Sequence, residues 1–171
     1  SWGTPFVGGN SEFEMNGYRN LDARTLYHYN AIVVTPAMAA PMPEGRGSKY
    51  SSTYVDEDGN YLNGSKTYRL HVPPNVPVRE FWSITVYDPA TRSQLQTSQP
   101  LPSISSQQNP PANADGSVDI YFAPKKPKGV AAENWIQTVA GKGFFPFYRF
   151  YGPLKAYNDQ TWRPVEIELV K

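Results

Sequence analysis

The sequence predicts a mainly β protein, an antiparallel β-sandwich of jelly-roll type with one N-terminal helix and long loops. Six or more segments alternate apolar and polar residues, and no helical pattern separates consecutive ones, which disfavours a βαβ protein. Aromatic residues make up 14% of the 171 residues, which opposes disorder, while 17 prolines and 13 glycines indicate many turns. A chain of this length is typical of one domain with a sizeable core.

The N-terminal part of the chain has a different composition from the rest. Residues 1–16 are rich in glycine, asparagine and aromatic residues, which predicts an extended arm or linker. A single β-rich domain is predicted over residues 17–171. The one substantial helix is expected over 20–32, where apolar residues recur at helical spacing behind a capping Asn20 or Asp22.

Alternating residues predict the strands of the sandwich, at 50–55, 67–72, 80–88, 117–122, 144–151 and 164–170. Segment 80–88 is predicted to be central and covered on both sides, because bulky residues occupy both of its faces. One face carries Trp82, Ile84 and Val86, and the other carries Phe81, Thr85 and Tyr87. The polar stretch 89–114 predicts a long loop or a set of short turns.

Composition excludes several classes of function. Because the formal net charge is only +1, with no basic excess, we expect no nucleic-acid partner. The absence of cysteine excludes disulfides, thiol nucleophiles and thiolate zinc sites. The apolar runs are too short to span a bilayer, and the sequence lacks a nucleophile elbow, a P-loop and a dinucleotide-binding motif.

One acidic turn has part of a calcium-loop pattern. Asp56, Asp58 and Asn60 stand at positions one, three and five of such a loop. The pattern then fails, because Tyr61 replaces the glycine and Thr67 the final glutamate that the loop requires. The segment is therefore either a weak Ca²⁺ site or a plain acidic hairpin turn, and no other cofactor is predicted.

Five further residues are candidates for ligand binding. Arg149 stands alone in a strongly aromatic strand, where a charge requires a partner or a ligand. Trp135 and Trp162 lie in irregular segments, so they either form a stacking platform or fill the core. Asp88 is the last residue of the best predicted strand and can fix the orientation of a ligand, and His71 lies on the polar side of another strand.

Several segments together resemble the family called domain of unknown function 1214 (DUF1214). The most specific is the run Phe-Trp-Ser-Ile-Thr-Val-Tyr-Asp at 81–88. The others are Asp-Gly-Asn-Tyr-Leu-Asn-Gly at 58–64, Tyr-Arg-Leu at 68–70, Asn-Ala-Asp-Gly-Ser-Val at 113–118, Asn-Trp at 134–135 and Phe-Tyr-Arg-Phe-Tyr-Gly-Pro at 147–153, with Trp162. The resemblance covers the chain from about residue 17 to its end.

This resemblance implies a β-rich, jelly-roll-like domain. It also implies that residues 1–16 form the linker to an upstream module, domain of unknown function 1254 (DUF1254). Many bacterial relatives look exported, so a periplasmic or extracellular location is expected rather than a cytoplasmic one. The family offers no agreed catalytic residues. Relatives often have Leu-Pro after Asn-Trp, whereas this chain has Ile136 and Gln137, so the shape of that loop is in question.

Two classes of function fit these observations. The first is a non-catalytic module that binds a carbohydrate-like or polar small molecule, or that assembles with the upstream module or with a second copy. The alternative is a hydrolase or lyase on a jelly-roll scaffold, with or without the assistance of a metal ion, that uses Asp88, Arg149, His71 and nearby carboxylates. An enzyme requires these groups to converge in one pocket.

Overall fold

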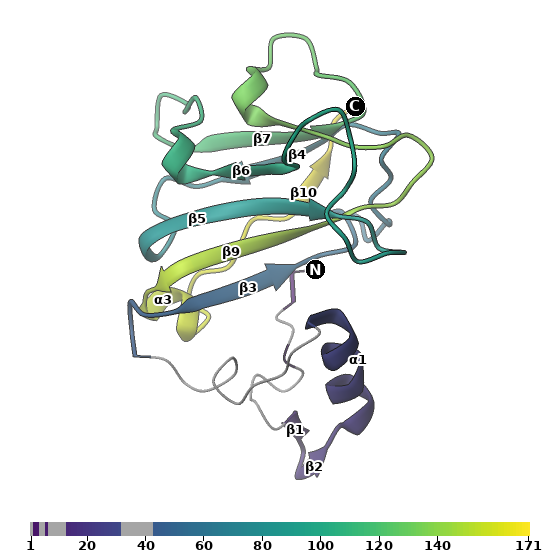
Figure 1. Ribbon diagram of the computed structural model, residues 1–171. Coiled ribbons are helices and arrows are strands. Elements are labelled where there is room, and N and C mark those ends of the chain that lie inside the picture. Colours follow the sequence, from purple (N-terminus) through teal and green to yellow (C-terminus); the bar gives the residue numbers. More distant parts are fainter. Residues whose placement is uncertain (1, 4–5, 7–12, 32–42) are drawn as a thin grey trace.

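The computed structural model of the protein describes residues 2–3, 6, 13–31 and 43–171. Residues 48–169 contain the strands of a β-sandwich of two four-stranded sheets (Figure 1). The first sheet has the order β3 (Ser48–Ser52), β9 (Phe145–Pro153), β5 (Val78–Tyr87) and β6 (Ser103–Ser105). The second has the order β10 (Ile167–Leu169), β4 (Tyr68–Val72), β7 (Val118–Ala123) and β8 (Trp135–Gln137). The predicted sandwich with one N-terminal helix is confirmed.

Almost all neighbouring strands are antiparallel, as the sequence predicts. The exception is the pair β7 and β8, which runs parallel and places Tyr121 opposite Trp135. The first sheet has its longest pairing between β5 and β9, where Ser83 lies opposite Arg149 and Ile84 opposite Tyr148. This register decides which side chains share each face of the sheet.

The core lies between the two sheets and follows the predicted alternation. From β5, Trp82, Ile84 and Val86 point inward and are at most 7% exposed. The matching inward residues of the second sheet are Tyr68, Leu70 and Val72 of β4 and Val118, Ile120 and Phe122 of β7. Each fully buried side chain of this size stabilises the fold by roughly 1.5–3 kcal/mol.

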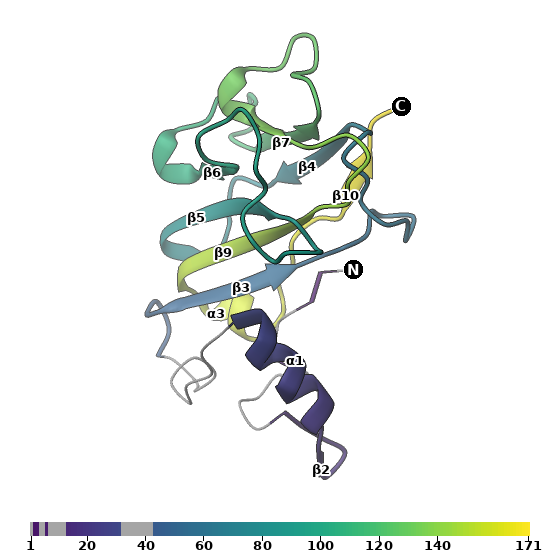
Figure 2. The same ribbon diagram turned by 45° about the vertical axis from the view of Figure 1, so that its right-hand side comes forward.

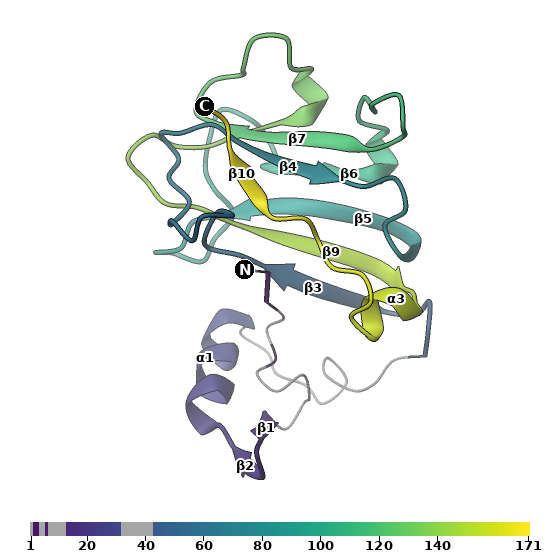
Figure 3. The ribbon, with the colours of Figure 1, turned by 180° about the vertical axis from the view of Figure 1, so that it is seen from behind.

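A small N-terminal unit lies beyond β3, outside the sandwich (Figures 2 and 3). It consists of the hairpin β1 (Glu14–Met15) and β2 (Tyr18–Arg19) and the helix α1 (Leu21–Ala31). Tyr27 of α1 is buried against the rings of Phe6 and Phe13, with ring centroids 4.7 and 5.6 Å away. The predicted helix end at Ile32 and most of the predicted arm lie outside the described residues.

The remaining elements are short. They are η2 (Ser106–Gln108), η3 (Ala132–Asn134) and α3 (Lys155–Asn158). The stretch 89–114, predicted as a loop or short turns, contains β6 and η2. The sequence did not predict these two elements, because three residues are too few to show a periodic pattern. Within the described ranges, no helix has the length and apolar character needed to cross a membrane.

Candidate functional site

The outer face of the first sheet carries aromatic rings around one arginine. Along β9, Tyr148 and Phe150 point into the core, so Phe147, Arg149 and Tyr151 point outward. The neighbouring strands add Tyr50, Phe81, Tyr87 and a row of hydroxyl side chains. We name this surface the aromatic face and define it by the residues Tyr50, Phe81, Tyr87, Phe145, Phe147, Arg149 and Tyr151. Figure 1 looks onto it, and no helix crosses strands β9 and β5 there.

The rings of the aromatic face contact one another across the strands. Tyr87 lies 5.6 Å from Phe145 and 5.4 Å from Phe147, measured between ring centroids. Tyr50 continues the series at 6.4 Å from Phe147. These rings are partly exposed, apart from the buried Phe145. The face therefore offers flat apolar surface to a ligand while its backbone is fixed by the sheet.

Arg149 lies near the middle of this face and is half-buried. Its Nη1 donates a hydrogen bond to Oγ1 of Thr85 at 2.7 Å, and its Nη2 donates to the hydroxyl of Tyr87. The guanidinium also lies 5.7 Å from the centroid of the Tyr87 ring, within cation–π distance. Both hydrogen-bond partners are neutral hydroxyl groups.

A second arginine reaches the same rings from the loop that follows β5. Arg92 lies 5.6 Å from the ring centroid of Phe145 and 5.8 Å from that of Tyr54, and its Nη1 donates to the Tyr54 hydroxyl at 2.7 Å. Its backbone has φ = 62°, a left-handed conformation that is uncommon outside glycine. The N–H of Arg92 donates to the carbonyl of Asp88 at 2.8 Å, which helps to hold this conformation.

The outer face of the second sheet is charged, and its charges are paired. Arg69 donates to Glu168 at 2.6 Å and lies 4.0 Å from Asp119. Nδ1 of His71 lies 2.8 Å from Oδ1 of Asp119, and Asn113 donates to the other oxygen of that carboxylate. We name Arg69, His71, Asp119 and Glu168 the charged face. The hydrogen bond from Arg69 to Glu168 raises the pKa of the guanidinium.

Asp88 lies at the turn that ends β5. Its Oδ1 accepts hydrogen bonds from the N–H groups of Ala90 at 2.8 Å and Thr91 at 3.3 Å, and its Oδ2 accepts one from Lys142 at 3.3 Å. The bond from Ala90 is the main cause of a lowered pKa for this carboxyl, with Lys142 contributing further. These hydrogen bonds indicate that Asp88 stabilises the turn that carries Arg92.

The two candidate tryptophans lie in different surroundings. Trp162 is partly buried and packs edge-on against Phe150, 5.7 Å away, at the side of the core. Trp135 is partly exposed on β8, where its indole N–H donates to the carbonyl of Ala123 at 2.9 Å. Neither ring belongs to the aromatic face.

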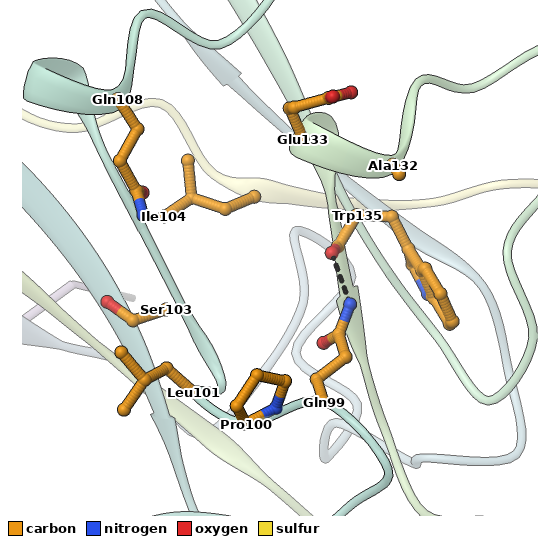
Figure 4. A pocket seen from close by; sticks show the side chains of 9 residues that line it. All are labelled: Gln99, Pro100, Leu101, Ser103, Ile104, Gln108, Ala132, Glu133 and Trp135. Carbon is orange, nitrogen blue, oxygen red and sulfur yellow. Dashed lines mark hydrogen bonds between the residues drawn. The ribbon is translucent and has the colours of Figure 1, made fainter.

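A pocket of about 220 Å³ opens between β6 and β8, where the edges of the two sheets meet (Figure 4). Within it, the side-chain amide of Gln99 accepts from the N–H of Gln137 and donates to the carbonyl of Trp135, so it occupies the free edge of β8. Figure 4 shows the indole of Trp135 turned away from the other lining side chains. The pocket contains one carboxylate, that of Glu133.

The predicted calcium loop forms a tight turn. Asp56 is buried, and its Oδ1 accepts hydrogen bonds from the N–H groups of Asp58 at 3.1 Å and Asn60 at 2.8 Å. Its Oδ2 is buried and accepts no hydrogen bond from the described residues. The described part of the chain contains no group of three or more histidine or carboxylate side chains placed to hold a metal ion. Calcium binding by this loop stays a prediction.

The structure therefore distributes the predicted site residues over separate regions. Arg149 lies on the outer face of the first sheet, His71 on that of the second, and Asp88 at the end of β5. The sequence did not identify Arg92, whose approach to the rings depends on a loop conformation. It also did not identify Tyr50, because the pairing of β3 with β9 is not visible in either segment alone.

The sequence and fold have relatives of unknown function. Residues 47–155 match the family described as "Protein of unknown function (DUF1214)". The crystal structure of the VPA0106 protein from Vibrio parahaemolyticus is similar with a TM-score of 0.65 and 26% identity. The alignment covers 91% of this chain and 36% of that protein, so this chain spans about a third of its length.

A second solved structure is more distant. It is a putative uncharacterized protein from Burkholderia cenocepacia, with a TM-score of 0.44 and 16% identity, over 78% of this chain and 32% of that one. No protein with a curated description matches this sequence.

Proposed function

The chain belongs to the DUF1214 family, whose description gives no activity, and we propose that this domain is a non-catalytic binding module. Its ligand site is the aromatic face, and its ligand is carbohydrate-like or another small polar molecule. The observation that carries this proposal is that partly exposed rings lie beside the hydroxyl of Tyr87 and the guanidinium of Arg149 on one sheet. Such a surface packs against the apolar side of a sugar ring and hydrogen-bonds its hydroxyls.

The positions of the polar groups favour binding over catalysis. Hydrolysis of a glycosidic bond normally needs two carboxyl groups on either side of that bond. The aromatic face, as defined by its seven residues, contains no carboxylate and no histidine. His71 and Asp119, the described pair that most resembles a general base with its orienting group, lie on the opposite side of the sandwich.

A titration of purified protein with neutral sugars tests the proposal. We expect D-glucose, D-galactose or a disaccharide of them to raise the melting temperature, because a ligand that binds only the folded state stabilises it. Tyr50→Ala should abolish this shift. Tyr121→Ala is the matched control, since Tyr121 is also a partly exposed tyrosine on an outer face, but of the second sheet. Equal responses of the two variants would contradict the assignment.

A second candidate function is assembly with the upstream DUF1254 module or with a second copy of the chain. It is favoured by exposed apolar side chains on the N-terminal unit: Met15, Tyr18, Leu21 and Leu26 are each more than half exposed. Light scattering after gel filtration, with Leu26→Glu as the variant, tests self-association. A monomer at every concentration would contradict self-association.

A further inference from the structure

We infer that the ligand of the aromatic face is an anionic sugar, in which a carboxylate or phosphate is bound by Arg149 together with Arg92. The inference rests on the proposed function and specifies its ligand. Three observations support it: Arg149 has no counter-charge among the described residues, Arg92 approaches the neighbouring ring, and the backbone of Arg92 is left-handed.

Arg149 has no anionic partner in the described part of the chain. No described carboxylate lies within 4.0 Å of it, although seven such contacts join other cationic and acidic groups. A guanidinium has five N–H donors, and the hydrogen bonds of Arg149 to Thr85 and Tyr87 use two of them. A half-buried arginine in this state is a ready site for two oxygens of an anion.

Arg92 adds a second positive charge to the same surface. The two guanidiniums lie over neighbouring rings, Arg149 over Tyr87 and Arg92 over Phe145, and the centroids of those rings are 5.6 Å apart. The partners of Arg92 are also neutral, namely the hydroxyl of Tyr54 and two ring faces. Neither guanidinium has a carboxylate within 4.0 Å among the described residues.

The backbone of Arg92 supports a role for its side chain in binding. A left-handed conformation is unfavourable at a non-glycine residue, so it persists where the surrounding structure enforces it. The carboxylate of Asp88 accepts hydrogen bonds from the next two loop residues that carry N–H groups, and the carbonyl of Asp88 binds the N–H of Arg92. The turn thus directs Arg92 over the aromatic face.

The ligand class follows from these charges and rings together. The rings contact the apolar side of a sugar, while the guanidiniums bind paired anionic oxygens, which arginine recognises in carboxylates and phosphates alike. A neutral sugar leaves the two positive charges unpaired. An anionic sugar neutralises these charges. The preference for an anionic over a neutral sugar should therefore weaken as added salt screens the charges.

Calorimetric titration tests the inference with three sugars that share the ring configuration of glucose. They are D-glucuronate, D-glucose 6-phosphate and D-glucose. We expect the wild type to bind glucuronate, the phosphate or both at least about tenfold more tightly than glucose. Arg149→Gln should remove this preference, because the affinity for the anionic sugars should fall at least about tenfold, to the level of the affinity for glucose. Arg69→Gln, the matched control on the second sheet, should keep it.

Each result has a defined meaning. Equal affinity of the wild type for all three sugars overturns the inference and leaves the proposed function intact, whereas no binding of any sugar overturns the proposed function as well. A preference that survives in Arg149→Gln and Arg92→Gln also overturns the assignment to these residues. Arg92 is exposed, so Arg92→Gln keeps the test decisive if Arg149→Gln does not fold.

Discussion

Two arginines on central strands, Arg69 in the second sheet and Arg149 in the first, point to the outer faces of their sheets and have opposite surroundings. Arg69 on β4 is bound to Glu168 at 2.6 Å and lies 4.0 Å from Asp119. Arg149 on β9 is bound to two hydroxyl groups and lies over an aromatic ring. The residue type and the place in the sheet are the same, and the neighbouring strands make the difference.

Because of this difference, the charge of Arg69 stabilises the fold, whereas the charge of Arg149 remains available to a ligand. The strands beside β4 supply carboxylates, so the charge of Arg69 is neutralised within the protein. The strands beside β9 supply Tyr50, Ser83, Thr85 and Tyr87 around Arg149, and the one carboxylate of β5, Glu80, is bound by Arg79. We expect changes on the charged face to alter stability, and changes on the aromatic face to alter binding.

Substitutions on the two sides of β9 should differ most in their effect on stability. Phe150 points into the core and is fully buried, so Phe150→Ala should lower the free energy of unfolding by about 3–5 kcal/mol. Phe147→Ala, on the outer side of the same strand, should cost about 1 kcal/mol. Urea unfolding measures both values. Similar losses would mean that the aromatic face is part of the core and not a surface for ligands.

Tyrosine hydroxyls give the next contrast. The hydroxyl of Tyr148 is fully buried and has no partner among the described residues, and burial raises its pKa well above the ordinary value. Tyr148→Phe should therefore stabilise the protein by about 1 kcal/mol. Tyr87→Phe removes a hydroxyl bound by Arg149 and should not stabilise it. Thermal unfolding compares the two variants, and a destabilised Tyr148→Phe would contradict this account.

A smaller effect is expected for the coupling energy between each arginine and its partner. A double-mutant cycle of Arg69 and Glu168, both about one-third exposed, should give a coupling of about 0.2–1 kcal/mol that falls as salt is added. A cycle of Arg149 and Tyr87 should give a coupling that salt leaves unchanged, because the hydroxyl is neutral. A strong salt dependence of the second cycle would indicate an acid near Arg149.

The smallest effect is expected in acid. The pKa of Asp88 is lowered by the hydrogen bond from Ala90, so its contribution to stability is present above the unfolded value of 3.8. That contribution is lost as the pH falls through the lowered pKa of the folded state. Asp159, whose hydrogen bond from Lys155 lowers its pKa to about 2, behaves in the same way at the acid end of this range.

Urea unfolding from about pH 5 to about pH 2 measures this loss. The wild type should lose more stability than Asp88→Asn over the range, since the amide does not titrate. If the unfolding free energies of the two proteins fell in parallel with pH, the charge of Asp88 would contribute nothing to stability. The seven residues of the aromatic face include no carboxylate, so their own charge should not change over this range.

The sequence predicted the long strands well because their alternation is strong. It indicated both the inward residues of β5 and the isolation of Arg149 in β9, which required a partner or a ligand. It did not predict β6 and β8, because each has three residues and pairs at a sheet edge. Strand register also lies beyond a single sequence, so the placement of Arg149 and His71 on opposite outer faces had to come from the structure.

NMR of the arginine side chains tests whether Arg149 and Arg92 bind the anionic ligand. The Nε–H signals of Arg149, Arg92 and Arg69 are assigned with the three Gln variants, and the protein is titrated with D-glucuronate and then with D-glucose. We predict that glucuronate shifts the signals of Arg149 and Arg92 in a saturable way, while that of Arg69 stays in place. A shift of Arg69 alone, or equal shifts of all three, would contradict the account.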